Sequence, residues 1–470
     1  MTPAPTTPHA GLLPFYLKLY DDLNPDYRAA FDGFIAQIRA ALEARGIAVN
    51  SAPICRLAGE FQVAMDQFEA ADVDCVVTLH LAYSPSLEAL DTFCRTRLPI
   101  IILDATMDAD FGRTVSPDRI MYNHGVHGVM DFASMLCRRR RSFEIVAGHG
   151  AAPRTLERAA DLVRAAFGAR RLRGSRVLRV GPPFVGMGDF AVAEEVLASV
   201  LGIHAEQVGV EVLDEAVQRV SDSAVQREVT QDCERFACEL PAEAHARSVR
   251  VGLGLRALLE TGGYGGFSVN FQAFDRSNRP ANTMPFLEIA KAMARGVGYA
   301  GEGDVLTAAL VGALARAFGA VTFTEIFCPD WAGESLFLSH MGEISPSVAG
   351  DRPRVIAKPL FSGGSMDPAL LTCAVQPGPA VLVNLAPGPD NTFTLIIAPV
   401  EALAEENLPV PVMRQNVRAW VRPSCGVAPF LEAFARAGGT HHSALLLGAR
   451  AEAVAAFGRM CGLRVVRIDA

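Results

Sequence analysis

The chain has 470 residues, 50% of them hydrophobic and 20% charged, with a formal net charge of −8. This length exceeds what one hydrophobic core usually supports, and the composition is that of a folded globular protein rather than a disordered one. The acidic balance argues against a nucleic-acid partner.

The cysteines and the N-terminal residues indicate a cytoplasmic protein. The 10 cysteines are scattered and form no Cys-x-x-Cys pair, and the closest two are Cys233 and Cys238, so we expect reduced, structural thiols. Residues 1–10 lack the basic segment that opens a signal peptide. The longest apolar run, 305–323, is interrupted by Arg316 and predicts no membrane span.

Residues 1–172 alternate between apolar strand-like runs and amphipathic segments with helical spacing. The strand-like runs cover 11–20, 47–55, 73–81 and 99–103, and a helix is expected over 27–45. Continuous Val and Ile runs between helices are typical of a parallel sheet covered on both faces. We therefore predict a first, doubly wound α/β domain over residues 1–172.

The same alternation predicts a second doubly wound α/β domain over residues 173–318. A strand begins at Val177, and later elements are expected at helices 191–202 and 211–220, strand 267–271 and helix 286–297. The glycine clusters at 252–254 and 262–266 lack the spacing of a dinucleotide-binding loop, so no nucleotide site is expected.

After residue 319 the pattern changes to short strands separated by Gly, Pro and Asp. This spacing is typical of an antiparallel sheet or barrel, and it predicts a C-terminal β-barrel-like domain over residues 319–470. The strand-like runs cover residues 321–326, 335–340, 355–360, 380–385 and 392–398.

Two acids and a histidine near the ends of predicted elements stand out as candidate metal ligands. Glu302 precedes an apolar helix, Glu325 ends a predicted strand, and His340 ends another. Carboxylates and imidazoles from separate elements suit a hard divalent ion such as Mn²⁺ or Mg²⁺. Other interpretations stay open at this point. Glu302 could be an acid favoured by a helix dipole, although Asp304 is the better N-cap, and the other two could be plain strand-end residues.

The pair His441–His442, in the segment AGGTHH, adds further imidazoles near the start of an apolar run, although it could equally be an ordinary loop pair. Glu343 follows His340 closely, and we expect it to support His340 or the strand end rather than to bind the ion.

Several segments together resemble the L-arabinose isomerase family, in the same order along the chain. They are MARGVGYAGEGDVLTAAL, the strand that ends in Phe-x-Glu, SHMGEISPSVA, GGSMDPA and AGGTHH, with Leu19–Tyr20 and Asn123 to Phe132 matching earlier in the chain. The resemblance implies two α/β domains, a C-terminal β-barrel-like domain, and a hexamer or other multimer with shared active sites.

The resemblance also implies roles for individual residues. Four of them would hold Mn²⁺, or another divalent ion such as Mg²⁺ or Co²⁺, and the two glutamates among them would also act as acid and base: Glu302, Glu325, His340 and His442. His127 would reach the substrate of a neighbouring subunit. Further substrate contacts would come from residues at or near the family's positions, namely Tyr20, Phe184, Phe271 and His441.

The implied activity is aldose–ketose isomerisation, most simply of L-arabinose to L-ribulose, in which an ion stabilises the enediolate and a glutamate moves the proton. The sequence does not say which glutamate is the base. Residues that usually read the sugar differ here, at 129–131 and 326–329. An isomerase for L-fucose, D-galactose or a rarer sugar is therefore an alternative, and a non-catalytic sugar- or metal-binding relative is another.

Overall fold

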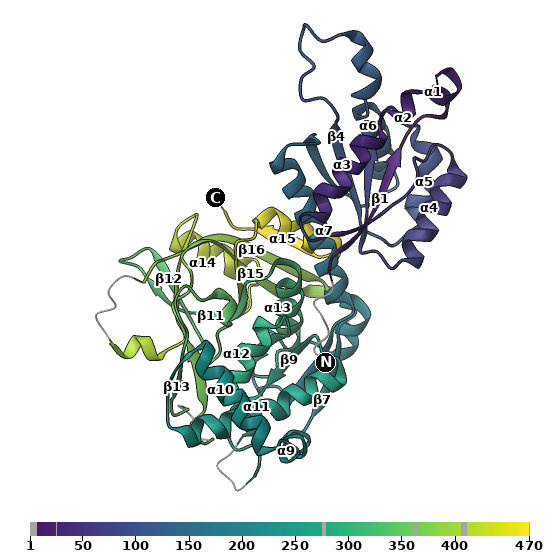
Figure 1. Cartoon of the computed structure of the whole chain (residues 1–470). Helices are drawn as coiled ribbons and strands as arrows, with labels where there is room; N and C mark the ends of the chain where they lie inside the picture. The colour runs from purple at the N-terminus through teal and green to yellow at the C-terminus, as the bar shows by residue number, and fades with distance from the viewer. Residues whose placement is uncertain (1–6, 25, 275–278, 361–364, 406–410, 470) are drawn as a thin grey trace. The chain divides into compact units, whose positions relative to one another are not determined.

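The computed structural model describes residues 7–24, 26–274, 279–360, 365–405 and 411–469 (Figure 1). These residues form two compact units, which lie within Thr6–Phe167 and Gly168–Ala470. Among them, no helix combines the length and apolarity needed to cross a membrane. The domain boundaries expected near residues 172 and 318 stay predictions.

The N-terminal unit is built on a parallel five-stranded sheet in the order β2-β1-β3-β4-β5. Every residue of β3 is buried, because helices cover both faces of a continuous apolar strand, and α3 and α4 lie on opposite sides of β1 (Figure 1). The strands are β1 (His9–Phe15), β2 (Ala48–Ser51), β3 (Cys75–His80), β4 (Ile100–Thr106) and β5 (Glu144–His149). The helices are α1 (Lys18–Leu23), α2 (Asp26–Ala29), α3 (Asp32–Glu43), α4 (Ala58–Ala70), α5 (Ser86–Arg95), α6 (Val126–Arg138) and α7 (Pro153–Arg173), whose residues from Gly168 onward belong to the second unit.

This strand order is that of a doubly wound domain, as predicted. The expected strand over residues 11–20 is shorter, since β1 ends at Phe15 and α1 begins at Lys18. The helix expected over 27–45 is broken into α2 and α3.

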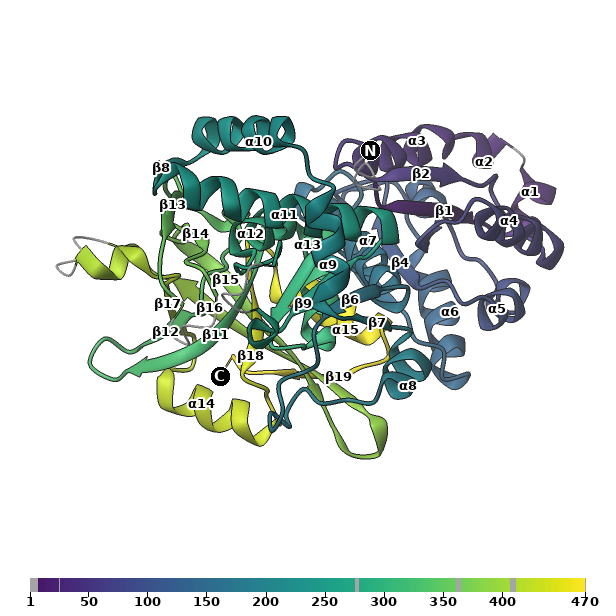
Figure 2. The same cartoon turned by 90° about the horizontal axis from the view of Figure 1, so that it is seen from below.

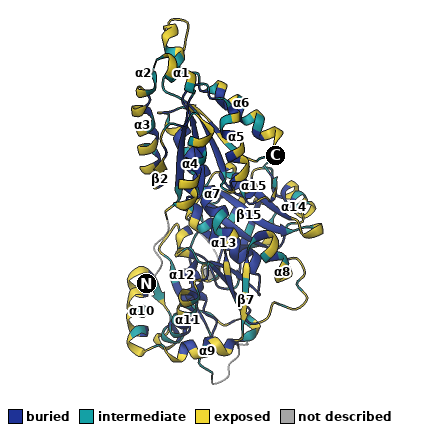
Figure 3. Ribbon diagram, turned by 90° about the vertical axis from the view of Figure 1, so that its right-hand side faces the viewer, coloured by how far each residue is buried: buried dark blue, intermediate teal, exposed yellow. Residues whose placement is uncertain are grey.

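The second unit begins with a parallel four-stranded sheet in the order β10-β9-β6-β7. Helices α12 and α13 pack against this sheet, α10 and α11 run side by side (Figure 2), and α9 and α10 carry many exposed residues (Figure 3). The strands are β6 (Arg176–Val180), β7 (His204–Val208), β9 (Gly266–Val269) and β10 (Gly298–Gly301). The helices are α8 (Glu194–Val196), α9 (Val210–Gln218), α10 (Asp222–Arg235), α11 (Ala242–Gly262), α12 (Phe286–Ala294) and α13 (Val305–Phe318).

The chain then forms a closed antiparallel barrel in the order β15-β18-β11-β12-β17-β16, which the pairing of β16 with β15 completes. Strand β19 (Arg464–Arg467) adds to β16 in parallel. The barrel strands are β11 (Val321–Asp330), β12 (Ser335–Ser339), β15 (Gly378–Pro387), β16 (Phe393–Ala402), β17 (Ala419–Pro423) and β18 (His442–Leu447), followed or separated by α14 (Val427–Arg436) and α15 (Ala451–Met460). The predicted fold class, two α/β portions and a C-terminal barrel, is confirmed.

The strand expected over 355–360 is not part of this barrel. It corresponds to β13 (Arg354–Ala357), which pairs antiparallel with β14 (Ala369–Thr372) and parallel with β8 (Ala237–Glu239) in a separate sheet. The apolar pattern of a strand shows which face is buried but not which edge it pairs with, so the sequence could not reveal the partner β8.

Helix α13 joins the parallel sheet to the barrel. It packs against β9 and β10 on one side and against β11 and β18 on the other, and most of its residues are buried. The helix and the strand approach so closely that only glycine fits at position 298. A Cβ there would lie 2.2 Å from the backbone nitrogen of Gly312. Glu302 precedes this helix and Glu325 follows it, so the packing of α13 determines where both carboxylates lie.

A buried ion network holds α10, α11 and α12 together. Lys291 Nζ lies 2.6 Å from Glu228 Oε1 and 2.9 Å from Asp232 Oδ1, and the Arg256 guanidinium binds both Glu228 and Glu288. Burial raises the pKa of Glu228, but Arg256 and Lys291 outweigh burial and lower that pKa to about 2. Folding therefore favours the ionised form of Glu228.

We expect the Glu228→Gln variant to be less stable than the wild type by on the order of 3 kcal/mol at about pH 7. A carboxyl group whose pKa falls on folding stabilises the folded state above its unfolded pKa, and this contribution is lost as the pH falls toward the folded pKa. The difference in urea unfolding midpoint should therefore shrink as the pH is lowered from about 5 toward about 2.

The matched control is Glu432→Gln on α14, whose carboxylate forms an exposed ion pair with Arg436. It should change stability by less than about 1 kcal/mol. A destabilisation by Glu228→Gln that is the same at both ends of the pH range would contradict the proposed ionisation.

Candidate metal centre

Glu302, Glu325, His340 and His442 come together in the second unit. Each offers one ligand atom, and these four atoms all lie within 4.8 Å of one another. The barrel register explains part of this arrangement, because Glu325 on β11 lies opposite Ser339 of β12 and opposite His442 of β18. His340 directly follows β12, and Glu302 directly follows β10. Four separate elements therefore supply the four side chains.

Both imidazoles direct Nε2 at the two glutamates. His442 Nε2 lies 2.9 Å from Glu302 Oε2 and 3.1 Å from Glu325 Oε1. His340 Nε2 lies 3.1 Å from Glu325 Oε1 and 3.6 Å from Glu302 Oε1. Two imidazole nitrogens and two carboxylates thus face one common point.

Each imidazole is held from behind by a further carboxylate. His442 Nδ1 is hydrogen-bonded to Asp304 Oδ2 at 2.9 Å, and both side chains are fully buried. His340 Nδ1 lies 2.9 Å from Glu343 Oε1, a close electrostatic contact rather than a well-aligned hydrogen bond. Carboxylates in this position fix the tautomer and orientation of metal-binding histidines. The expected supporting role of Glu343 matches this contact.

Aromatic rings enclose the two histidines. The Phe323 ring packs edge-on against His340 and His442, with ring centroids 4.8 and 4.9 Å away. The Phe190 ring stacks on His442 with a centroid distance of 5.0 Å and an interplanar angle of 10°. These rings restrict the imidazoles to one orientation and keep water from their faces.

The backbone at Glu302 adopts the left-handed conformation, with φ of 55°. This conformation costs a non-glycine residue about 1 kcal/mol or more, so the surroundings must hold it in place. Ser268 Oγ accepts from the nitrogen of Gly303 at 2.9 Å, and the nitrogen of Phe184 donates to the carbonyl of Glu302 at 2.8 Å. Such strain is typical of functional sites.

Gly301 leaves room for His340, since a Cβ there would lie 2.9 Å from Cε1 of that ring. The turn that carries Glu302 is therefore shaped to the imidazole beside it.

The glutamates and histidines of the centre shift each other's pKa values in opposite directions. Burial raises the pKa of Glu325, but His340 and His442 outweigh burial and lower it to about 2. They lower the pKa of Glu302 further still. Burial lowers the pKa of each imidazole, yet the carboxylates around it hold that pKa well above its usual value.

The donor set fits a divalent ion. Glu302, Asp304, Glu325 and Glu343 bring four carboxylates to the site, and no Lys or Arg contacts any of them within the part of the chain that the structure describes. Two carboxylate oxygens and two imidazole nitrogens suit Mn²⁺ and similar ions, and such an ion would supply the charge that buried carboxylates need.

Phe184, Phe271 and His441 also lie in the second unit. The rings of Phe184 and Phe271 lie 5.9 Å apart, and the backbone of Phe184 contacts Glu302 as described above. His441 Nε2 is 4.0 Å from Glu325 Oε1, and its Nδ1 lies 2.6 Å from Asp189 Oδ2. The imidazole of His441 is partly exposed, so it borders the four-residue group instead of belonging to it.

Tyr20 and His127 belong to the N-terminal unit. The Tyr20 hydroxyl is hydrogen-bonded to His124 Nε2 at 3.1 Å, and the rings of His124 and His127 lie 6.0 Å apart. Their predicted roles toward the substrate stay predictions.

Three residues of the site were not expected to act there: Asp304 behind His442, Asp189 behind His441, and Phe190. Asp304 was expected only as an N-cap, and it does accept from the nitrogen of Thr307 at 2.9 Å. Its second oxygen serves His442. Asp189 and Phe190 lie in a segment without regular structure, and no periodicity points to them.

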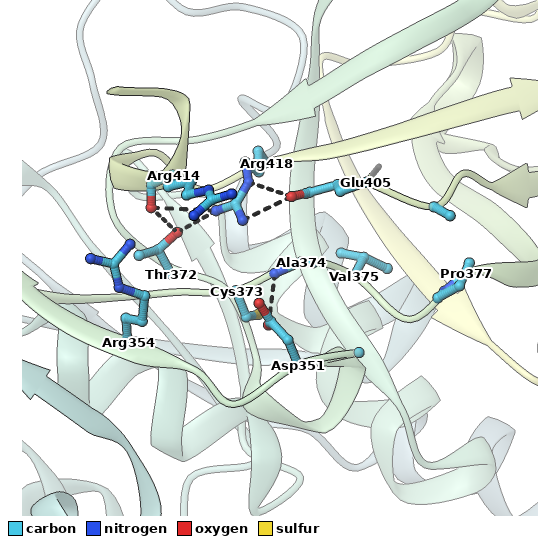
Figure 4. A pocket seen from close by; sticks show the side chains of 12 residues that line it. Asp351, Arg354, Thr372, Cys373, Ala374, Val375, Pro377, Glu405, Arg414 and Arg418 are labelled. Atoms are coloured by element: carbon cyan, nitrogen blue, oxygen red, sulfur yellow. Dashed lines mark hydrogen bonds and ion pairs between the residues drawn. The ribbon is translucent and has the colours of Figure 1, made fainter. Parts of the chain in front are cut away.

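A separate cavity of about 570 Å³ lies between β14 and the residues that precede β17 (Figure 4). Within it, Arg418 binds Oε2 of Glu405 and the hydroxyl of Thr372. No histidine lines it, and none of the four clustered residues does. The cavity is therefore not the candidate site.

We expect the Asp304→Asn variant to bind Mn²⁺ about 10- to 100-fold more weakly, because the amide no longer fixes His442 as a carboxylate does. Asparagine is also a preferred N-cap, so α13 should still form. Isothermal titration with Mn²⁺ measures the affinity. The control is Ser221→Asn, which changes the N-cap of α10. Equal affinities of all three proteins would contradict the role of Asp304.

Comparison with known proteins places the chain in a family. The L-arabinose isomerase central-domain model matches residues 185–318, and the C-terminal-domain model matches residues 320–464. The L-arabinose isomerase of Nocardioides sp. is 31% identical over 463 residues, which cover 93% of this chain and 89% of the relative. That of Herpetosiphon aurantiacus is 30% identical and covers 76% of this chain and 72% of the relative. The chain therefore belongs to the L-arabinose isomerase family, a family of aldose–ketose isomerases, as its sequence motifs indicated.

Proposed function

We propose that this protein converts L-arabinose to L-ribulose with a divalent ion held by Glu302, Glu325, His340 and His442. The observation that carries the proposal is the convergence of these four side chains, each imidazole backed by a further carboxylate. Mn²⁺ is the expected ion, with Mg²⁺ or Co²⁺ as alternatives. The relatives named L-arabinose isomerase support the choice of sugar.

The reaction moves one proton between adjacent carbons and another between their oxygens. When bound, the ion would act as a Lewis acid that polarises the substrate oxygens and so acidifies the carbon-bound proton. Glu302 and Glu325 face the same point. One can take the proton from C2 and return it to C1, while the other transfers the proton between the two oxygens. Each such group typically contributes about 10²–10⁴-fold to the rate.

The histidines hold this arrangement rigid. His340 and His442 have both ring nitrogens engaged, one toward the glutamates and one toward Glu343 or Asp304. Their rings are therefore poorly placed to shuttle protons, which leaves proton transfer to the two glutamates. The assignment of proton transfer to Glu302 and Glu325 therefore rests on their placement, since both carboxylates face the common point of the four side chains.

An isomerase for another aldose is the second candidate. The specific observation is the β-bulge between Ile326 and Cys328, immediately after Glu325 on β11. It lies in the segment 326–329, where sugar-reading residues were found to differ. A bulge beside a functional residue re-aims the side chains around it, and this would alter which sugar fits.

We further propose that the protein works in the cytoplasm as a homo-oligomer, in which His127 reaches the substrate of a neighbouring subunit. The exposure of the His127 side chain supports this role, because it is free to meet a partner. Mass measurement in solution tests it, since a monomer with full activity would contradict a shared active site.

The direct test is ketose formation from a panel of aldoses by the metal-stripped protein, with and without added Mn²⁺. The panel comprises L-arabinose, L-fucose and D-galactose. The proposal expects L-ribulose from L-arabinose at the highest kcat/KM, and only with the ion. A higher kcat/KM on another aldose would favour the second candidate, and no turnover of any sugar would contradict isomerase activity.

We expect Glu302→Gln and Glu325→Gln each to lower kcat by at least about 10²-fold, because each removes a proton-transferring carboxylate. Metal analysis of each variant separates loss of the ion from loss of proton transfer. Glu401→Gln, on an exposed position of β16, is the control and should keep wild-type kcat. Near-normal kcat in either site variant would exclude that glutamate as acid or base.

A further inference from the structure

Cys233, Cys238 and His245 form a second group of metal-binding side chains. Each offers one ligand atom, and these atoms lie within 4.8 Å of one another. Cys233 lies in the last turn of α10, Cys238 on β8, and His245 in the first turns of α11. A short stretch of chain therefore supplies two thiols and an imidazole at one point, and none of them belongs to the carboxylate–imidazole centre.

The imidazole of His245 is already held in place. His245 and Asp232 are buried, and His245 Nε2 lies 3.2 Å from Asp232 Oδ2. Lys291 Nζ in turn contacts both oxygens of Asp232, at 2.9 and 3.1 Å. A carboxylate on one ring nitrogen is the arrangement that orients metal-binding histidines, as Asp304 does for His442.

The backbone between the two cysteines is fixed from outside. Strand β8 pairs with β13, with Cys238 opposite Val355. The Arg352 guanidinium donates to the carbonyls of Cys233 and Phe236, at 3.3 and 3.1 Å. The thiols therefore occupy a supported turn, and they do not depend on a free loop to approach each other.

The spacing suits a tetrahedral ion after a small adjustment. Zn–S and Zn–N bonds of about 2.3 and 2.0–2.1 Å place neighbouring ligand atoms roughly 3.5–3.8 Å apart. The ligand atoms lie within 4.8 Å of one another, so each pair must approach by at most roughly 1.0–1.3 Å, which side-chain rotation can supply. Cys233 is exposed and Cys238 partly so, which leaves an entry path and a fourth position for water.

We propose that Cys233, Cys238 and His245 bind one soft divalent ion of the Zn²⁺ type and so fasten α10, β8 and α11 together. Thiolates favour Zn²⁺ over Mn²⁺, whereas the carboxylate–imidazole centre favours the harder ion, so the two sites select different metals. Both thiols lose their protons on binding. Without an ion, burial and the neighbouring Cys233 thiol raise the pKa of Cys238 to about 12, which favours the protonated thiol. A bound cation favours the thiolate instead.

Co²⁺ is the probe that distinguishes the two sites. Coordination by thiolate produces a sulfur-to-cobalt absorption in the near ultraviolet that carboxylates and imidazoles cannot give. We expect one equivalent of this signal when the reduced, metal-stripped full-length protein is titrated with Co²⁺, and we expect Zn²⁺ to displace it. Glu325→Gln should keep the signal, because Glu325 belongs to the other centre.

Three variants and a thiol assay complete the test. Cys233→Ser and Cys238→Ser should lose the signal, whereas Cys425→Ser, a partly buried cysteine outside the group, should keep it. In the wild type, Zn²⁺ should slow the reaction of Cys233 and Cys238 with a thiol reagent by at least about tenfold, because only the free thiolate reacts. This second readout holds even if a variant fails to fold.

The proposal is overturned if Co²⁺ gives no thiolate absorption, or if Cys238→Ser folds and retains the full signal. It is also overturned if the protein freshly purified under reducing conditions carries a Cys233–Cys238 disulfide that Zn²⁺ does not prevent from forming.

Discussion

The site depends on the contacts of two buried imidazoles with carboxylates. Each imidazole faces Glu302 and Glu325 with Nε2 and a further carboxylate with Nδ1. His442 lies between Glu302 and Asp304, and His340 between Glu325 and Glu343. Buried carboxylates at this density are unstable without positive charge. A divalent ion supplies that charge and lets both histidines stay neutral, which is the state in which they bind metal.

The fold serves this constraint through α13. This helix lies between the parallel sheet and the barrel, so the turn that carries Glu302 and the strand that carries Glu325 are fixed to the same rigid element. The cross-strand register of β11 with β18 then adds His442, and the end of β12 adds His340. Proton transfer requires such fixed geometry, because small displacements of a catalytic group cost large factors in rate.

Much of the fold could be predicted from the sequence, because apolar runs identify strands and their alternation with helices identifies the two parallel sheets. Asp304 could be predicted as an N-cap because it directly precedes the apolar helix. The motif segments identified all four clustered residues as candidate metal ligands. The partner of β13 could not be predicted, since edge pairing depends on tertiary packing. Glu325 also lies inside β11 and not at its end, because the strand continues past a bulge to Asp330.

The residues that shape the site from outside, such as Asp189 beside His441 and Phe190 on His442, left no pattern in the sequence. His441 and Asp189, which are in contact, lie 252 positions apart in the sequence. Only folding brings such positions together, so the local spacing of residues does not predict these contacts.

The central claim is that one ion binds at the four clustered side chains, and anomalous X-ray diffraction at the manganese edge tests it most directly. Crystals of the metal-stripped protein soaked in Mn²⁺ should show one strong peak within about 2–2.4 Å of oxygens from Glu302 and Glu325 and of Nε2 of His340 and His442. A fully occupied peak elsewhere, with none between these four residues, would contradict the account.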